Sequence, residues 1–146
     1  ADEATSALDV TVQAHILKLL GTLCREKGTA IVFITHDLGI AAQICDRVAV
    51  MYLGRIVETA SAEAIYTNPK HPYTQALFGS IPRIGRKSSE RLPTITGSVP
   101  DPYNVPKGCP YHPRCGDFMA GKCDLDQEIP FFEVGPNHRV RCWLYE

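Results

Sequence analysis

The hydrophobic pattern of the first half of the chain changes from helical to strand-like within about thirty residues. Between residues 10 and 27 apolar side chains recur at helical spacing, with Asp9 placed to begin a helix and Gly28 placed to end it. Residues 30–35 then form a continuous, largely β-branched apolar run, which is typical of a strand covered on both faces of a parallel sheet. A helix followed by such a strand predicts an α/β fold.

Further elements are expected after this strand. Asp37 is suited to cap a helix over residues 38–45, and residues 47–59 predict a β-hairpin that turns at Gly54. Two short helices are then expected, over residues 61–67 with Ser61 as the cap and over residues 72–80 with Pro72 in the first turn.

The pattern decays in the second half of the chain. Residues 85–91 are polar and predict a linker, and residues 92–142 are interrupted by prolines with no period long enough to build a layer. Eight of the 11 prolines and four of the six cysteines follow residue 85. We therefore predict two regions, residues 1–85 with an α/β pattern and residues 86–146 as an irregular, cysteine-rich extension.

Charge and composition exclude several classes of protein. The 15 Lys and Arg residues are balanced by 16 Asp and Glu residues, so no basic field favours nucleic acid as a partner. No apolar run approaches the roughly 18 to 20 residues that span a bilayer, and residues 1–9 lack the pattern of a signal peptide. Neither membrane insertion nor secretion is expected.

The most informative motif lies at the amino terminus. Two adjacent acids, Asp2-Glu3, suit a site where one carboxylate faces a divalent cation and the next faces a water, as nucleotide hydrolysis requires. Thr5-Ser6-Ala7-Leu8-Asp9 follows directly, and Thr35-His36-Asp37 stands at the end of the next predicted strand. Together these motifs resemble the Walker B end, the D-loop and the H-loop of the ATP-binding subunits of ABC transporters.

The resemblance narrows to the oligopeptide and dipeptide importers and covers nearly the whole chain. It rests on the following segments: Asp9-Val10-Thr11-Val12-Gln13-Ala14, Tyr52-Leu53-Gly54-Arg55-Ile56-Val57-Glu58, Asn68-Pro69-Lys70-His71-Pro72-Tyr73-Thr74-Gln75-Ala76-Leu77, and a terminal region with four cysteines. It implies part of a P-loop NTPase domain with a parallel sheet. It also implies transmembrane permease subunits, a second ATPase subunit and, indirectly, a peptide-binding protein as partners, at the cytoplasmic face of the membrane.

The resemblance assigns a role to each motif residue, with ATP and Mg²⁺ as cofactors. Asp2 would hold Mg²⁺ through water, Glu3 would polarise the attacking water, and His36 would sense the γ-phosphate. Ser6 and Asp9 would lie in the D-loop, at the interface with the second ATPase subunit. From the residues alone, Asp9 is equally well explained as a helix cap.

The phosphate-binding motif Gly-x-x-x-x-Gly-Lys-Ser/Thr does not occur in these 146 residues, and neither does Leu-Ser-Gly-Gly-Gln. We therefore interpret the chain as the portion of an ATP-hydrolysing subunit from the Walker B end onward, and expect this portion alone to be inactive. The alternative interpretation is a metal-stapled structural or regulatory module without catalysis.

The four late cysteines, Cys109, Cys115, Cys123 and Cys142, are separated by gaps that contain no two-residue zinc knuckle. A cytosolic family disfavours disulfides, whereas zinc, with His112 or His138 as substitute ligands, and free thiols stay open. Four thiolates in an irregular loop suit an iron–sulfur cluster, and the resemblance favours the 4Fe-4S type. Such a centre would order a segment that has too little apolar area to order itself. Cys24 and Cys45 are expected to be core residues.

Overall fold

The computed structural model describes residues 1–81 and 95–146 of the chain. The predicted linker over residues 85–91, and with it the boundary between residues 85 and 86, lies outside this part. The described residues divide into two compact units, residues 1–46 and residues 47–146.

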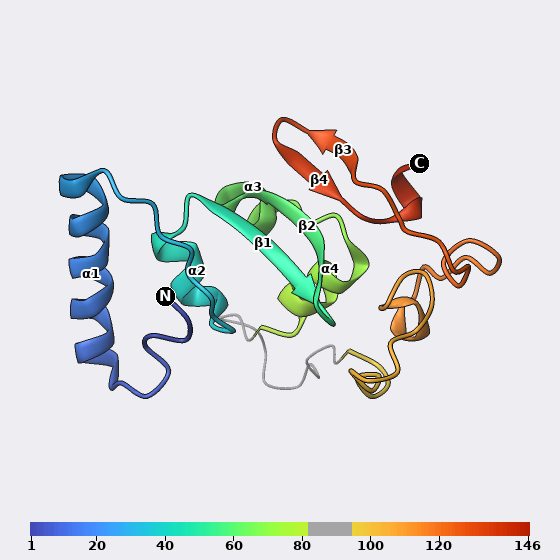
Figure 1. Cartoon of the computed structure of the whole chain (residues 1–146), viewed down its shortest axis with the longest axis horizontal. Helices are drawn as coiled ribbons and strands as arrows, with labels where there is room; N and C mark the ends of the chain where they lie inside the picture. The colour runs from blue at the N-terminus through green and yellow to red at the C-terminus, as the bar shows by residue number, and fades with distance from the viewer. Residues whose placement is uncertain (82–94) are drawn as a thin grey trace, which may run out of the picture. The chain divides into compact units, whose positions relative to one another are not determined.

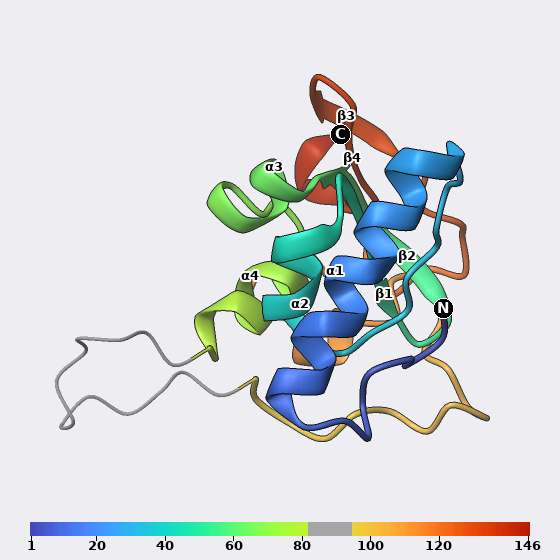
Figure 2. The ribbon, with the colours of Figure 1, turned by 90° about the vertical axis from the view of Figure 1, so that its left-hand side faces the viewer.

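Two helices form the first unit. Both begin where the sequence predicted; the first also ends there, and the second ends one residue before the predicted residue 45. Helix α1 (Val10–Lys27) begins at Asp9, whose side chain accepts hydrogen bonds from the first-turn backbone amides, and ends at Gly28 in the left-handed conformation, with φ +61° (Figures 1 and 2). Helix α2 (Leu38–Ile44) begins at Asp37, whose side chain accepts from the backbone N–H of Ile40. These local signals therefore act as expected.

The predicted parallel sheet is absent from the described residues, where the sheet is antiparallel throughout. Residues 30–35 form no regular strand; one isolated parallel bridge joins Asp2 to Ile34. The side chains of Val32 and Ile34 are largely exposed. An apolar run indicates a preference for burial between layers, but a parallel ladder also needs neighbouring strands. Among residues 1–81 and 95–146, only the first three residues pair with this run.

The second unit is built on a four-stranded sheet in the order β1-β2-β4-β3 (Figure 1). Strands β1 (Arg47–Tyr52) and β2 (Arg55–Ser61) form the predicted hairpin. Its two-residue turn consists of Leu53 and Gly54, both with positive φ, at 43° and 76°. A turn of this hand matches the twist of the two strands.

The cysteine-rich region contributes two strands, which corrects the expectation of an irregular extension without layers. Strand β4 (His138–Val140) pairs with β2 on one side and with β3 (Phe132–Gly135) on the other, so it lies inside the sheet. Pro130 precedes this hairpin and Pro136 lies in its turn. Proline is compatible with strands at these positions because no ladder hydrogen bond is lost there.

Two short helices complete the ordered frame of the second unit: α3 (Ala62–Thr67), which begins at Ser61 and contacts β1 and β2, and α4 (Pro72–Gly79), which begins at His71. Two single turns of 3-10 helix follow in the cysteine-rich region, at His112–Arg114 and Trp143–Tyr145. No helix in residues 1–81 or 95–146 is long and apolar enough to cross a membrane.

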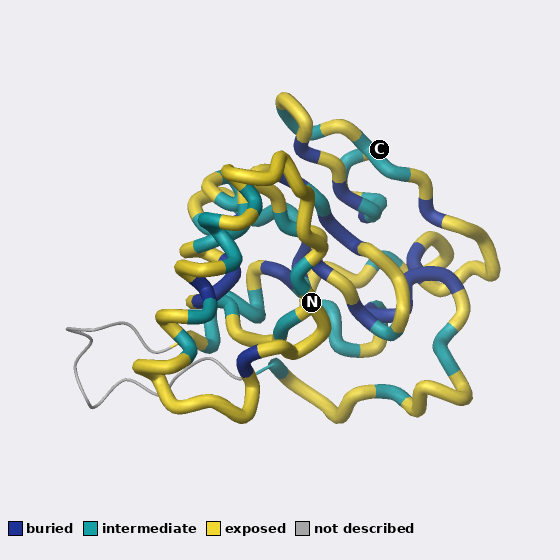
Figure 3. Tube along the Cα trace, turned by 60° about the vertical axis from the view of Figure 1, so that its left-hand side comes forward, coloured by how far each residue is buried: buried dark blue, intermediate teal, exposed yellow. Residues whose placement is uncertain are grey.

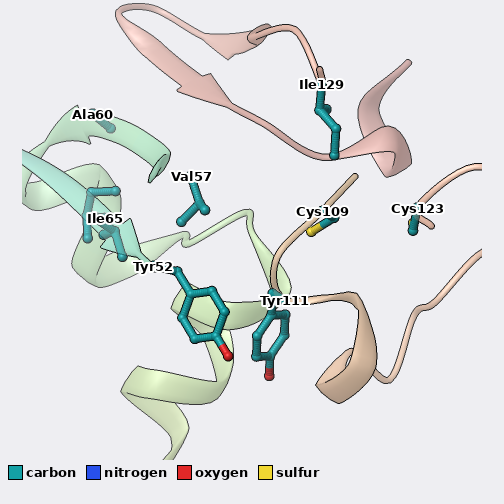
Figure 4. Packing of buried hydrophobic residues seen from close by; sticks show 9 residues of the cluster. Tyr52, Val57, Ala60, Ile65, Cys109, Tyr111, Cys123 and Ile129 are labelled. Atoms are coloured by element: carbon teal, nitrogen blue, oxygen red, sulfur yellow. The ribbon is translucent and has the colours of Figure 1, made fainter. Parts of the chain in front are cut away.

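A hydrophobic cluster joins the sheet of the second unit to its cysteine-rich segment (Figure 4). Figure 3 shows the buried positions along the backbone trace. The rings of Tyr52 and Tyr111 meet edge to face, with centroids 5.3 Å apart, and so connect β1 to the loop after Cys109. The buried members of the cluster are Val50, Tyr52, Val57, Ala60, Ile65, Cys109, Tyr111, Cys123 and Ile129. Apolar packing therefore organises this segment more than its proline content suggested.

Candidate catalytic and thiol sites

The first three residues lie beside residues 32–36. The backbone N–H of Glu3 donates to the carbonyl of Ile34 at 3.0 Å, and the N–H of Ile34 donates to the carbonyl of Ala1 at 2.8 Å. The terminal ammonium of Ala1 adds a bond to the carbonyl of Val32. This short parallel pairing fixes the acidic pair next to His36.

Glu3 and His36 meet directly, 33 positions apart in the chain. The distance from Oε1 of Glu3 to Nδ1 of His36 is 3.0 Å, and the two side chains are 55% and 77% exposed. An ion pair so open to solvent contributes little to stability. The contact therefore positions a carboxylate and an imidazole side by side at the surface, where a substrate or a water can reach both.

Of the remaining residues of the amino-terminal motif, Asp2 and Ser6 lie next to Glu3, and Asp9 caps the following helix. Asp2 is exposed beside Glu3, and Ser6 Oγ donates to the backbone carbonyl of Glu3 at 3.0 Å. Asp9 accepts from the backbone N–H groups of Thr11 and Val12, both at 3.0 Å, so in this structure it acts as the cap of α1.

All four late cysteines line one cavity in the second unit. Cys109 and Cys115 stand on either side of the 3-10 turn at His112–Arg114, and Cys142 immediately precedes the turn at Trp143–Tyr145. The other residues that line the cavity are His71, Pro72, His112, Asp117, Met119, Cys123, Ile129 and Trp143. Cys24 and Cys45, in the first unit, are only partly buried, and none of the six cysteines forms a disulfide.

A close backbone contact positions two of these cysteines. The N–H of Cys109 donates to the carbonyl of Cys123 at 2.9 Å, and the two residues lie on neighbouring segments in Figure 4. Gly108, with φ +67°, precedes Cys109, and a Cβ atom there would lie 2.4 Å from the carbonyl oxygen of Cys123. Only glycine therefore permits the two segments to approach this closely.

Burial raises the pKa of three of the four late thiols. The pKa of Cys109 rises to about 11 and that of Cys142 to about 12; burial is the largest cause, backbone hydrogen bonds oppose it, and the neighbouring thiols add to it. The pKa of Cys115 is also raised, again chiefly by burial. Any metal bound here must therefore displace protons, and its binding would be coupled to pH.

His71 is the residue of this cavity whose role the sequence did not predict. Its ring is 1% exposed, and its Nδ1 accepts a hydrogen bond from the backbone N–H of Tyr73 at 3.1 Å. Burial lowers the pKa of His71 to about 4, against the opposing charge of Glu58. The imidazole is therefore neutral at pH 7. The available signal was the His-Pro-Tyr triplet, which the sequence analysis used only for its resemblance.

Glu58 is the second buried group that the sequence did not predict. Its carboxylate is 0% exposed and accepts from the backbone N–H of Lys70 at 2.7 Å, the N–H of His71 at 2.8 Å and Nε2 of His138 at 2.7 Å. It thereby joins β2, the start of α4 and β4. Of the two histidines considered as substitute metal ligands, His138 is thus engaged by Glu58, while His112 lines the cavity.

The described residues contain no group of three or more His, Cys, Asp or Glu side chains placed to hold a metal ion. The four thiols line one cavity but do not surround a common point. The iron–sulfur and zinc expectations are thus not established by this arrangement, and the donor chemistry is considered again below.

Comparisons with known proteins show what the chain is similar to. Residues 57–123 match the family described as "Oligopeptide/dipeptide transporter, C-terminal region". The chain is 48% identical over 144 residues to the oligopeptide transport ATP-binding protein OppD of Bacillus subtilis and 49% identical to OppD of Haemophilus influenzae. These alignments cover 99% of this chain but 40% and 43% of the relatives. The chain therefore spans less than half of their length.

Proposed function

Because the chain belongs to the family of ATP-binding subunits of oligopeptide ABC importers, we propose that it is part of an ATP-hydrolysing subunit that powers peptide import. The observation that carries this proposal is the contact of 3.0 Å between Glu3 and His36. It unites two motifs that the sequence analysis assigned separately to the Walker B end and to the H-loop. Opposed carboxylate and imidazole groups at an exposed edge are suited to orient water against a phosphate.

Each residue of the amino-terminal motif has a defined task in this proposal. Asp2 holds Mg²⁺ through water, Glu3 polarises the attacking water, and His36 contacts the γ-phosphate and keeps the Glu3 carboxylate in position. Ser6 restrains the backbone at Glu3. Asp9 caps α1 and faces a second ATPase subunit when two subunits close on ATP.

The proposed setting is the cytoplasmic face of the cell membrane, where the subunit is peripheral. Its partners there are transmembrane permease subunits and a second, identical or paralogous ATPase subunit, with a peptide-binding protein as an indirect partner. The relatives carry the names of peptide-transport ATP-binding proteins, which supports this assignment.

Substitution in a full-length subunit that contains this sequence tests the catalytic roles. Glu3→Gln is expected to leave ATP binding nearly intact and to lower turnover at least about 100-fold, because the carboxylate orients water and does not hold the nucleotide. His36→Ala is expected to act in the same direction. Glu26→Gln, at an exposed position in α1, is the matched control. Wild-type turnover in both site variants would refute the assignment.

The 146-residue chain alone is expected neither to bind nor to hydrolyse ATP, since the motif that cradles the phosphates is absent from its sequence. Isothermal titration calorimetry with Mg-ATP measures this directly. Saturable binding in the micromolar range by the chain without any partner would contradict it.

A metal centre held by Cys109, Cys115, Cys123 and Cys142 is the second part of the proposal, and we favour a 4Fe-4S cluster. A single zinc ion needs all four sulfurs within about 2.3 Å of one atom, whereas a four-iron cluster distributes its thiolates over four separate irons. The four cysteines line one cavity and supply the four thiolates that such a cluster requires, with zinc as the alternative. Bound there, the group would supply a covalent crosslink between segments up to 33 positions apart.

The visible absorption spectrum and metal content of anaerobically prepared protein test this part. We expect iron and sulfide in equal amounts, lost when any one of the four cysteines is replaced by serine and retained in Cys24→Ser. If one zinc ion is bound tightly per chain instead, the centre is a zinc site. If neither iron–sulfur nor zinc is found, the proposed metal centre is refuted. If the chain binds metal but the full-length subunit with Glu3→Gln hydrolyses ATP at the normal rate, the alternative of a structural module without catalysis is favoured.

A further inference from the structure

Two buried hydrogen-bond donors of the thiol cavity have no acceptor among the residues that the structure describes. They are Nε2 of His71 and Nε1 of Trp143, and both residues line the cavity together with the four cysteines. Buried polar groups without partners are few in native proteins, and each one calls for an explanation. Two of them on the wall of one cavity indicate that something in the cavity accepts hydrogen bonds.

The protonation of His71 follows from its contacts. Nδ1 accepts a hydrogen bond from the backbone N–H of Tyr73, so this nitrogen carries a lone pair and no proton. The proton of the neutral ring therefore resides on Nε2, which makes Nε2 a donor. The backbone of His71 is held in turn, because its N–H donates to Oε2 of the buried Glu58 at 2.8 Å. The ring is thus fixed at both its backbone and its Nδ1 side.

Trp143 is restrained in a similar way. Its indole packs on Phe132 of β3, with ring centroids 5.8 Å apart, and it directly follows Cys142. An indole N–H can only donate. Both unpartnered groups are therefore donors, and neither has the rotational freedom of an exposed side chain to find another acceptor.

We propose that His71 and Trp143 donate hydrogen bonds to the sulfur atoms of the group held by the four cysteines and so raise its reduction potential. The inference rests on the proposed metal centre. Thiolate and sulfide sulfur in a bound cluster carry negative charge, which protonated thiols lack, and so they supply the acceptors that these donors need. Hydrogen bonds to sulfur stabilise the reduced, more negative state of such a cluster. His71 and Trp143 are positioning and tuning residues, since neither is a ligand.

Two substitutions separate the two functions of the His71 ring. In His71→Asn the side-chain oxygen still caps α4 in the place of Nδ1, but the donor at the position of Nε2 is lost. In His71→Gln the amide nitrogen reaches the position of Nε2, but the cap is lost. Trp143→Phe retains an aromatic ring and removes the N–H group. His15→Asn is the control, because His15 is exposed in α1 of the first unit and its Nδ1 contacts the carbonyl of Thr11.

The measurement is the midpoint potential of the full chain after reconstitution with ferrous iron and sulfide, followed by the visible absorption. We expect a more negative potential in His71→Asn and in Trp143→Phe, a potential near that of the unchanged chain in His71→Gln, and no shift in His15→Asn. A purely structural role of His71 would instead give the larger effect in His71→Gln, which loses the cap.

Two results overturn the inference, and they are distinguishable. If the chain takes up the cluster and His71→Asn and Trp143→Phe leave its potential unchanged, the hydrogen bonds do not exist, while the proposed metal centre stands. If the unchanged chain takes up no iron and sulfide under the same conditions, the proposed metal centre fails and the inference fails with it.

Discussion

The two units of the chain differ in how well each buries its own apolar residues. In residues 47–146, Ala60, Ile65 and Val140 are fully buried, and a continuous cluster joins the sheet to the cysteine-rich segment. In residues 1–46, Val10 and Val32 are about 80% and 79% exposed. The first unit thus carries the residues proposed for catalysis, and the second carries most of the packing. Chemistry in the first unit depends on a few local contacts, whereas the second unit has a core that supports a site by itself.

Core truncation is expected to give the largest contrast between the units. Ile65→Ala removes a fully buried side chain of α3 and is expected to lower the free energy of unfolding by about 2–5 kcal/mol, including the cost of the cavity. Leu19→Ala in α1, at a side chain 54% exposed, is expected to change it by less than about 1 kcal/mol. Urea unfolding of the full chain compares the two. Equal losses would show that α1 is buried in solution and would remove the contrast.

The buried carboxylate of Glu58 is expected to produce the next largest effect. Glu58→Gln turns one acceptor oxygen into an amide nitrogen that faces donors, which leaves buried N–H groups without partners. A loss of about 2–4 kcal/mol is expected, measured by urea unfolding. Glu63→Gln, at an exposed position of α3, is the control and is expected to stay within about 0.5 kcal/mol. If the Glu58→Gln chain is as stable as the Glu63→Gln control, the hydrogen-bonding groups around Glu58 are accessible to water in the folded protein.

These outcomes bear on what the sequence alone could predict. Asp9, Gly28, Asp37 and Gly54 were assigned correctly because a cap or a turn is determined by residues within a few positions. The parallel sheet was predicted wrongly from residues 30–35, because an apolar run does not specify which segments pair with it. The local hydrophobic period thus predicts which type of element forms, whereas the segments that pair with it determine whether the sheet is parallel or antiparallel.

The candidate sites show the same difference between features that the sequence pattern predicts and features that depend on distant partners. The resemblance assigned Glu3 and His36 to ATP hydrolysis, and the donor chemistry assigned the four cysteines to one metal centre. In the structure Glu3 contacts His36, and the four cysteines line one cavity. The roles of Glu58 and His71 were not predicted, because both depend on partners that no local pattern indicates. A glutamate in an apolar strand gives no sign that the donors to its carboxylate lie in a later loop and in the last strand.

Acidification is expected to weaken the second unit selectively when no metal is bound. The pKa of His71 is lowered to about 4 by burial, from an ordinary value of 6.5. The unfolded chain therefore takes up a proton between these two values while the folded chain does not, so stability is lost as the pH falls from 6.5 toward 4. The group that opposes this depression is Glu58. Between pH 7.5 and pH 5 the loss is about 2 kcal/mol.

His71→Asn isolates this contribution, because it removes the titrating group and keeps the cap of α4. Urea unfolding of metal-free protein at the two pH values is expected to show a decline smaller by about 2 kcal/mol in this variant. An identical decline in both proteins would mean that His71 becomes protonated in the folded state at pH 5.

The cap of α1 is expected to give the smallest effect and tests how far the first unit depends on local contacts. Asp9→Ala removes the acceptor for the N–H groups of Thr11 and Val12 and is expected to cost about 1 kcal/mol. Amide hydrogen exchange of the first turn of α1 measures it, and Asp9→Asn, which keeps an acceptor, is expected to retain most of the protection. Unchanged exchange in Asp9→Ala would mean that packing, and not the cap, holds this helix end.

The hydrogen bonds accepted by the buried Glu58 carboxylate also have a consequence for the order in which the second unit folds. The hairpin of β1 and β2 closes through neighbours in sequence, but the bond from Glu58 to His138 closes a loop of 80 positions. Contacts of such long range form slowly, since the chain entropy of the loop must be lost first. During synthesis the hairpin can therefore assemble early, while its central carboxylate stays hydrated until β4 arrives. The last strand of the chain thus completes the unit, and a ribosome that stalls before His138 leaves the unit open at its centre.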